Sequence, residues 1–494
     1  MTLPFALTRP RIGIFLGPLL FVFIRLLPTT ESMPPHAMDV AAVAVLMATF
    51  WISEAIPLAA TALIPIALFP LLGVMPTDKV TLAYGNHLIF LFMGGFLIAM
   101  AIEKWQLHRR IALHTILLVG VTPERIVLGF MLATAFLSAW ISNTATAMMM
   151  VTIGLAVIRQ SLPAETTAQG ETCSSPFATT LMLGIAYASS IGGVATLIGT
   201  PPNAILAGVI ESSYGYKIGF AEWMLFGVPL SAVMLAITWF YLTRVGFHCE
   251  FRELPGGKQA IRQQLVNLGP MSLAEKKVLS VFLLVAIGWI VRGLIDIDVF
   301  KQLNDSSIAM MGALLLFIIP ANFSKGEFLL DWQTARNIPW DIIILFGGGF
   351  ALASGFVSSG LTEWLASQLI GLQGMNIIIT VATIVALVIM LTEVTSNTAT
   401  ASMLLPIVGA FAIAVQVHPM YLMSAVALAA SFAFMLPVAT PPNAIVFSSR
   451  QITVPQMARA GIWLNILGVI LITLFVIILL PLVFDLSTPL GKNS

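Results

Sequence analysis

The six residues SNTATA at 142–147 occur a second time, unchanged, at 396–401. A second string, TPPNAI, occupies 200–205 and returns at 440–445. The first pair is offset by 254 residues and the second by 240, and the order of the strings is the same in both copies. Ordered matches at nearly one offset indicate an internal duplication.

A third, looser pair supports the duplication: LFMGGF at 91–96 and LFGGGF at 345–350, again 254 residues apart. All three pairs consist of polar, glycine or proline residues set in very apolar sequence. In membrane proteins such breaks are where a transported solute is held. The repeats therefore predict a binding site built from two related halves of the chain.

The composition indicates a membrane protein. Of the 494 residues, 59% are hydrophobic and 9% are charged. A membrane-spanning helix needs about 20 apolar residues, and the apolar runs provide about eleven such spans, some long enough to include a re-entrant hairpin. We therefore predict an all-α polytopic membrane protein with no sizeable soluble domain, whose first span is retained at 13–30.

The distribution of basic residues predicts the orientation. Most of the 23 Lys and Arg residues lie in alternate loops, including the start of the chain and the long polar loop at 244–277. The positive-inside rule then places the N-terminus in the cytoplasm and the C-terminus outside. The glycine-rich helices around 94–95 and 347–349 would cross in opposite directions, so the two halves form an inverted repeat, as in many secondary transporters.

Each Ser-Asn-Thr sequence predicts the tip of a re-entrant helical hairpin, because it lies between two apolar arms. Non-helical backbone at that depth is tolerated only where it is buried in protein or lines a cavity. The hydroxyl, amide and carbonyl oxygens of such a tip are neutral ligands that suit a hard monovalent cation, whereas calcium sites recruit several carboxylates. A structural hydrogen-bond cluster is the alternative, but the repetition favours a binding role.

The Thr-Pro-Pro-Asn sequences predict broken helices. Two prolines end one helix, and a threonine followed by proline is typical of the start of the next. Thr200 and Thr440 are therefore expected to cap half-helices that begin at Pro201 and Pro441, where exposed amides attract anions. The alternative is a simple proline kink, which would explain a single copy of the motif but not two matching copies. No Lys or Arg lies in either motif pair, so anion binding is predicted to require bound cations.

The sequence leaves the roles of two acidic residues within apolar sequence undecided. Glu54 lies near the predicted inner boundary, and Glu393 lies four residues before Asn397 on a hairpin arm. Either carboxylate could relay protons or support a cation site. Either could equally be a packed or interfacial group.

At these residues the chain resembles the divalent anion:sodium symporter (DASS) family. The resemblance covers almost the whole chain and rests on both motif pairs, the glycine-rich helices and the stretch EKWQLHRR at 103–110. It implies a homodimer of elevator-type transporters, in which a transport domain moves against a fixed scaffold. The implied division is N-terminal scaffold helices at 1–125, a first transport half at 126–247, a cytoplasmic linker with further scaffold helices at 248–375, and a second transport half at 376–485.

The resemblance also implies roles for individual residues. One sodium site would use Ser138, Ser142, Asn143 and the carbonyl of Gly199. The other would use Thr392, Thr395, Asn397 and the carbonyl of Ala439. The two carboxylates of the substrate would be held by Ser142, Asn143, Thr144, Thr200, Pro201, Ser396, Asn397, Thr398, Thr440 and Pro441.

We therefore predict an inner-membrane symporter that couples sodium to C4-dicarboxylates such as succinate, malate and fumarate, with no nucleic-acid partner and no cofactor besides the coupling ion. A sodium-independent dicarboxylate exchanger and a carrier for citrate or sulfate are alternatives with the same fold. A sodium/proton antiporter would need a titrating carboxylate at the ion site, where only Glu393 is near. An enzyme is not expected, because a hydrolase needs a nucleophile and a base and neither motif contains histidine.

Overall fold

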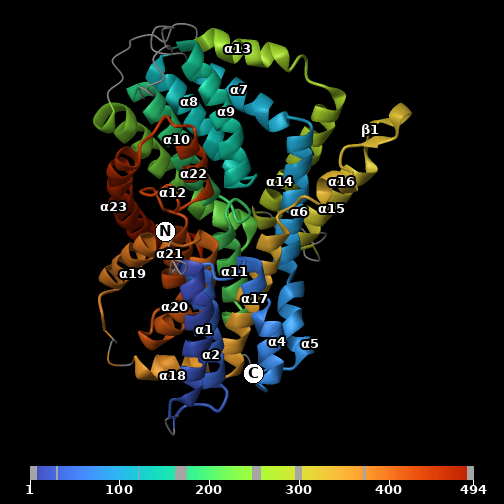
Figure 1. Ribbon diagram of the computed structural model, residues 1–494. Coiled ribbons are helices and arrows are strands. Elements are labelled where there is room, and N and C mark those ends of the chain that lie inside the picture. Colours follow the sequence, from blue (N-terminus) through green and yellow to red (C-terminus); the bar gives the residue numbers. More distant parts are fainter. Residues whose placement is uncertain are drawn as a thin grey trace, which may run out of the picture.

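The chain is almost entirely helical, and its helices are interrupted at the repeated sequences (Figure 1). The computed structural model describes residues 8–28, 32–120, 122–161, 175–247, 257–294, 303–369, 371 and 374–486. The N-terminal part forms α1 (Arg9–Leu26), α2 (Ala37–Ser53), α3 (Leu58–Thr61), α4 (Ile64–Leu71), α5 (Thr77–Leu82), the 3₁₀ turn η1 (Ala83–Gly85), α6 (His87–Lys104) and α7 (Leu107–Val119).

Each Ser-Asn-Thr sequence separates two helices, as predicted. The first hairpin consists of α8 (Pro123–Ser138) and α9 (Asn143–Ser161), and the second of α19 (Ile377–Thr392) and α20 (Asn397–Ala414). Each Thr-Pro-Pro-Asn sequence likewise follows a break, between α10 (Pro176–Gly193) and α11 (Pro201–Tyr214), and between α21 (Pro419–Ala430) and α22 (Pro441–Ser448). The duplication read from the sequence is therefore a duplication of structure.

The remaining elements lie between the two repeats and after the second. They are α12 (Phe220–Phe240), the π-helical turn η3 (Tyr241–Gly246), α13 (Gly257–Asn267), α14 (Leu273–Leu294), α15 (Asp305–Ile318), β1 (Pro320–Asn322), the 3₁₀ turn η5 (Phe323–Lys325), β2 (Glu327–Phe328), α16 (Trp332–Ala335), α17 (Trp340–Ser358), α18 (Leu361–Gln368), α23 (Val454–Ile478) and α24 (Leu480–Val483). The predicted helical class agrees with the structure, which adds one short antiparallel pair, β1 with β2. Gly326, with φ of 65°, lets the chain turn between them.

Five helical segments within the described residues are long and apolar enough to cross a membrane: Thr77–Lys104, Phe220–Gly246, Trp340–Ser358, Asn397–Ala414 and Val454–Val483. Five shorter apolar helices accompany them. The expected count of about eleven spans therefore stays a prediction.

The two repeats pack against each other in a crossed arrangement. The arm α9 of the first hairpin contacts α22 of the second repeat, and the arm α20 of the second hairpin contacts α11 of the first. Each hairpin also packs on the broken helix of its own repeat, α8 on α10 and α19 on α21. The two tips and the two half-helix starts are thereby brought to one region of the molecule.

The first helix begins earlier than the predicted 13–30. It starts at Arg9, with proline in its first turn, where the missing amide hydrogen costs no intrahelical bond. Glycines at 13 and 17 allow α1 to lie closely on α2, because a β-carbon at either position would overlap side chains near the end of α2. The first turn of α1 is thereby fixed beside the C-terminus of α2.

Close backbone packing between α8 and α10 gives a first testable prediction. A β-carbon at Gly192 would overlap the backbone of Ala135 in the hairpin arm. We expect Gly192→Ala to destabilise the protein by about 1–3 kcal/mol, because backbone cannot move aside as a flexible side chain can. Thermal unfolding of the detergent-purified protein measures the effect. Gly85→Ala is the control, since nothing lies within 4 Å of a β-carbon there; equal unfolding temperatures for both variants would contradict the packing.

Candidate substrate and cation site

One cavity of about 730 Å³ receives both hairpin tips and both half-helix starts. All ten residues predicted to hold the substrate line it: Ser142, Asn143, Thr144, Thr200, Pro201, Ser396, Asn397, Thr398, Thr440 and Pro441. Of the predicted sodium ligands, Gly199, Thr395 and Ala439 also line the cavity. Ser138 and Thr392 do not face it; both are fully buried behind its wall.

Ser138 lies directly behind the first tip. Its Oγ is 2.5 Å from Asn143 Oδ1 and 2.7 Å from the carbonyl oxygen of Ser189. Glycines make room for this cluster: a β-carbon at Gly193 would lie 2.7 Å from Asn143 Oδ1 and 3.2 Å from the carbonyl oxygen of Gly199. The structure therefore brings together Ser138, Asn143 and the Gly199 carbonyl, three of the ligands predicted for the first sodium site.

Thr392 occupies the equivalent place behind the second tip. Its Oγ1 is 2.8 Å from Asn397 Oδ1 and 2.9 Å from the carbonyl oxygen of Ala430. A hydroxyl has one hydrogen and can donate to only one of two acceptors. In each repeat, three oxygen atoms thus converge with a single hydrogen among them, and the unused lone pairs suit a cation.

The two oxygen clusters are not identical. Thr395 Oγ1 lies 2.9 Å from the carbonyl oxygen of Leu391 and 2.7 Å from Thr400 Oγ1. The corresponding residue of the first repeat, at the 254-residue offset, is Ile141, which has no oxygen in its side chain. The second tip therefore has a side-chain hydroxyl where the first has an alkyl group. The first cluster in turn has the Ser189 hydroxyl, 3.5 Å from Ser138 Oγ, where the second has Ala430. Thr395 and Asn397 both line the cavity.

The asparagine of each Thr-Pro-Pro-Asn motif supports the break and does not line the cavity. Asn203 Nδ2 donates to the carbonyl oxygen of Thr196 at 2.8 Å. Asn443 Nδ2 donates to the carbonyl oxygens of Ala433 and Leu436 at 3.1 and 3.0 Å. Both asparagines are fully buried. They hold the unwound segments in place, a role that the sequence analysis missed although the repetition of the asparagine was a signal for it.

The predicted half-helix starts are confirmed. Thr200 and Thr440 are the N-cap residues of α11 and α22, which begin at Pro201 and Pro441. The Thr440 side chain accepts a hydrogen bond from the amide of Asn443 at 3.3 Å. Thr200 Oγ1 instead lies 3.5 Å from Ser431 Oγ in the second repeat. Both N-termini lie at the cavity wall. Each half-helix starts with two prolines, which have no N–H, and the amides of Asn203 and Asn443 bond to the N-cap threonines. The attraction for an anion therefore comes from the positive end of the helix dipole.

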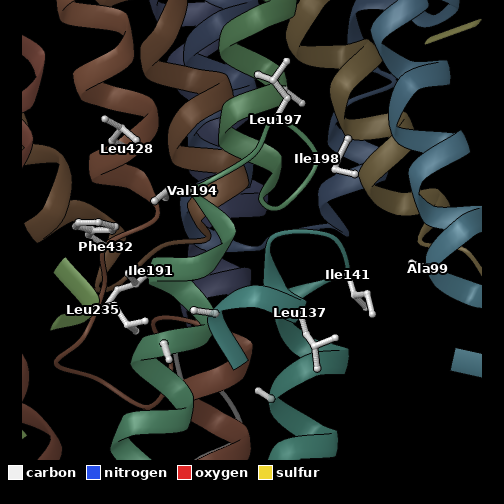
Figure 2. Close-up of a cluster of buried hydrophobic side chains, with 14 of the residues drawn as sticks. Ala99, Leu137, Ile141, Ile191, Val194, Leu197, Ile198, Leu235, Leu428 and Phe432 are labelled. Atoms are coloured by element: carbon white, nitrogen blue, oxygen red, sulfur yellow. The ribbon is translucent and has the colours of Figure 1, made fainter. Parts of the chain in front are cut away.

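Apolar side chains surround the first tip and its unwound segment. Figure 2 shows Leu137 and Ile141 around the end of α8, and Val194, Leu197 and Ile198 along the segment between α10 and α11. These side chains are at most 7% exposed. The low polarity strengthens electrostatic interactions within the tip and raises the free-energy cost of leaving its polar groups unpaired.

Charge is confined to the edge of the cavity. Among the described residues that line it, Arg9 is the only basic and Glu54 the only acidic one. Both are exposed. The wall formed by the two tips and two half-helix starts thus offers hydroxyls, amides and carbonyls without a formal charge.

Glu393 is not part of the cavity wall. It is 3% exposed, and its Oε1 accepts hydrogen bonds from the amides of Phe434 and Met435 and from Asn465 Nδ2, at 2.8, 2.9 and 2.7 Å. Its Oε2 accepts one from the amide of Leu436 at 3.0 Å. These contacts favour the packed-carboxylate interpretation, in which Glu393 holds the unwound segment before α22. Burial of a carboxylate is tolerated when donors compensate it in this way.

Comparison with known proteins agrees with this arrangement. Residues 12–484 match the family described as "Sodium:sulfate symporter transmembrane region". The sodium-dependent dicarboxylate transporter SdcS of Staphylococcus aureus strain USA300 is 46% identical over 97% of this chain and 93% of its own length. The protein of the same name from strain MRSA252 is 46% identical over 99% of this chain and 94% of its own length.

Two solved structures share the fold. The Alcanivorax borkumensis YdaH transporter superposes with a TM-score of 0.53 and 12% identity, over 98% of this chain and all of the other. Neisseria gonorrhoeae MtrF, described as one of a class of antimetabolite efflux pumps, gives a TM-score of 0.57 and 10% identity, over 97% and 96% of the two chains. The prediction of a transporter, and not an enzyme, is confirmed. The chain is a multi-pass membrane protein that belongs to the sodium:sulfate symporter family.

Proposed function

We propose that this protein is a sodium-coupled symporter of C4-dicarboxylates such as succinate, malate and fumarate. It acts in the inner membrane, with its N-terminus in the cytoplasm and its C-terminus outside. The substrate class follows the name of the SdcS relatives, which are similar over nearly the whole chain. Sodium is the only cofactor, as the coupling ion.

The observation that carries this proposal is the single cavity between two matching sets of donors. Each set consists of a Ser-Asn-Thr tip and the N-terminus of a half-helix. A C4-dicarboxylate has a carboxylate at each end, so each set binds one end. Hydroxyls and side-chain amides donate to carboxylate oxygens, and the positive end of each half-helix dipole adds attraction for the anion.

Cation binding completes the site. The two oxygen clusters behind the tips, one around Ser138 and Asn143 and the other around Thr392 and Asn397, each hold a sodium ion. Sodium binds first, orders the tips and supplies the positive charge that the uncharged wall lacks. Dianion binding then follows, and this order links substrate movement to the sodium gradient.

Domain movement of the elevator type fits the contacts. The two hairpins and broken helices pack on one another and form the transport domain, at 126–247 and 376–485. The segments at 1–125 and 248–375 form the scaffold, which contacts the transport domain through α17 against α11. The halves are related as an inverted repeat, and the protein acts as a homodimer through the scaffold.

Reconstitution in liposomes tests the function directly. We expect labelled succinate to accumulate when an inward sodium gradient is present, and to stay at the level of protein-free liposomes when potassium replaces sodium. Removal of sodium should act on binding as well as on transport, because the carboxylate site depends on the bound cation. Isothermal titration of the detergent-purified protein with succinate, with and without sodium, measures that dependence.

Two results would contradict the proposed symport of dicarboxylates and identify another function. Uptake that is driven by internal dicarboxylate and is indifferent to sodium would identify an exchanger. Sodium-driven uptake of sulfate or citrate in preference to succinate would identify a carrier for those anions.

A further inference from the structure

The cavity is lined in part by helix ends that lie outside the repeated motifs, and we take these ends to mark its mouth. Arg9 lies at the start of α1, Glu54 at the end of α2, and Ile342 in the first turn of α17. In the predicted orientation all three are cytoplasmic ends of their helices. The mouth therefore opens toward the cytoplasm, and a substrate entering or leaving on that side passes the two charged residues.

Packing of α1 on α2 places Arg9 at this mouth. Gly13, one turn after Arg9, has no space for a β-carbon because the Ser53 side chain occupies that position, and Ala55 is also in contact. Glu54 ends α2 with left-handed backbone (φ 51°), a conformation that is uncommon outside glycine and orients the residue away from the helix. Two opposite charges are thus held at one opening by fixed backbone.

We propose that Arg9 is a docking residue for a carboxylate of the substrate at the cytoplasmic mouth, and that Glu54 opposes it. The inference rests on the proposed dicarboxylate transport. The guanidinium attracts the dianion into a cavity whose inner wall has no positive side chain, and it offers a fork of donors that matches a carboxylate. The Glu54 carboxylate repels the same dianion, which keeps it from remaining at the mouth.

Because both charges lie at the cytoplasmic mouth, substitutions of Arg9 and Glu54 should affect transport from one side of the membrane only. Arg9→Gln should raise the half-saturating succinate concentration on the cytoplasmic side by about three- to tenfold, the size of an attraction between exposed charges in water. Glu54→Gln should lower it by a similar factor. Neither variant should change the half-saturating concentration on the outer side, because the charges line only the cytoplasmic mouth.

The test uses inverted and right-side-out membrane vesicles from cells that express the full chain. Inverted vesicles present the cytoplasmic mouth to the medium, and right-side-out vesicles present the outer face. The effect of Arg9→Gln should shrink when N-methylglucamine chloride is added at constant sodium, since salt screens exposed charges. Arg9→Lys should retain most of the wild-type affinity. Arg11→Gln is the control, as Arg11 is on the same helix but does not line the cavity.

The outcomes separate this inference from the proposed function. If the wild-type protein transports succinate and Arg9→Gln is unchanged on the cytoplasmic side, the docking role is wrong while the symporter stands. The role is also wrong if Arg9→Gln impairs both sides equally, or if Arg11→Gln has the same effect. Wild-type vesicles without any sodium-driven succinate uptake would instead refute the symporter.

Discussion

Asn397→Ala is expected to reduce sodium-driven succinate uptake to the background of protein-free liposomes, and Asn143→Ala should do the same. Each substitution removes an amide oxygen that lies 2.8 or 2.5 Å from the hydroxyl of the oxygen cluster behind its tip. A polar contact to a charged group contributes about 1.5–3 kcal/mol, which corresponds to about 10- to 100-fold in sodium affinity. Because dianion binding depends on the bound sodium, the loss extends from the cation to the substrate.

The fold should survive these two substitutions. Both asparagines are half-buried residues at the first position of a helix. The buried hydroxyl that each contacts keeps a second acceptor in the variant, the carbonyl oxygen of Ser189 or of Ala430. Size-exclusion chromatography and thermal unfolding should therefore give values close to the wild-type protein. Asn337→Ala is the matched control, since Asn337 is exposed, does not line the cavity, and its side chain donates to the carbonyl oxygen of Gln333. Normal sodium-dependent uptake by Asn397→Ala would remove this residue from the sodium site.

Sodium titration distinguishes the two oxygen clusters. In Asn143→Ala and Asn397→Ala, the sodium concentration that half-saturates succinate binding should rise. Succinate binding should recover in part at very high sodium concentration. A variant that lowers maximal binding without shifting the sodium dependence would show that its asparagine contacts the substrate alone. Different hydroxyls lie beside the two clusters, Ser189 at the first and Thr395 at the second, so the two asparagine variants should differ in the size of the shift.

Local chemistry made the breaks in the helices predictable. Proline determines where a helix can begin, so the starts of α11 and α22 at Pro201 and Pro441 follow from the sequence to the residue. The grouping of all ten predicted substrate residues in one cavity was also predictable, because a duplicated motif implies two related surfaces that can face each other.

Contacts between distant segments were not predictable in the same way. The carbonyl oxygens of Ser189 and Ala430 approach the buried hydroxyls, but a backbone carbonyl has no signature in the sequence. The placement of Arg9 at the cavity depends on how closely α1 and α2 pack, which is a tertiary property. The first span was predicted too late in the chain because apolar sequence, and not the proline in the first turn, was used to set its start.

The role of Glu393 also depends on such contacts, since its donors lie about 40 and 70 residues further along the chain, well beyond the reach of a helical pattern. Three amides of the unwound segment and one side-chain amide converge on a single carboxylate. From the sequence, a carboxylate that relays protons or supports a cation site and a packed or interfacial carboxylate were equally open. The geometry instead connects the second hairpin arm to the segment that precedes the half-helix α22.

Glu393→Gln should therefore destabilise the protein. A glutamine has one acceptor oxygen in place of two, and its NH₂ group would face amide donors. We expect a loss of about 3–5 kcal/mol, as for other buried charged networks that lose a partner, and an unfolding temperature lower by about 3–5 °C. Asn465→Ala removes one of the four donors and should cost less, about 1.5–3 kcal/mol. Glu327→Gln is the control, because Glu327 is exposed on β2.

Stability and transport together separate the two interpretations of Glu393. If Glu393 holds the unwound segment, Glu393→Gln lowers the unfolding temperature, and uptake falls because α22 no longer presents its N-terminus to the cavity. The variant should then lose activity at every pH. If Glu393 relays protons, the same variant unfolds at the wild-type temperature and loses only the pH dependence of uptake. Thermal unfolding and uptake measured across pH on one preparation decide between them, and an unchanged unfolding temperature would overturn the structural role.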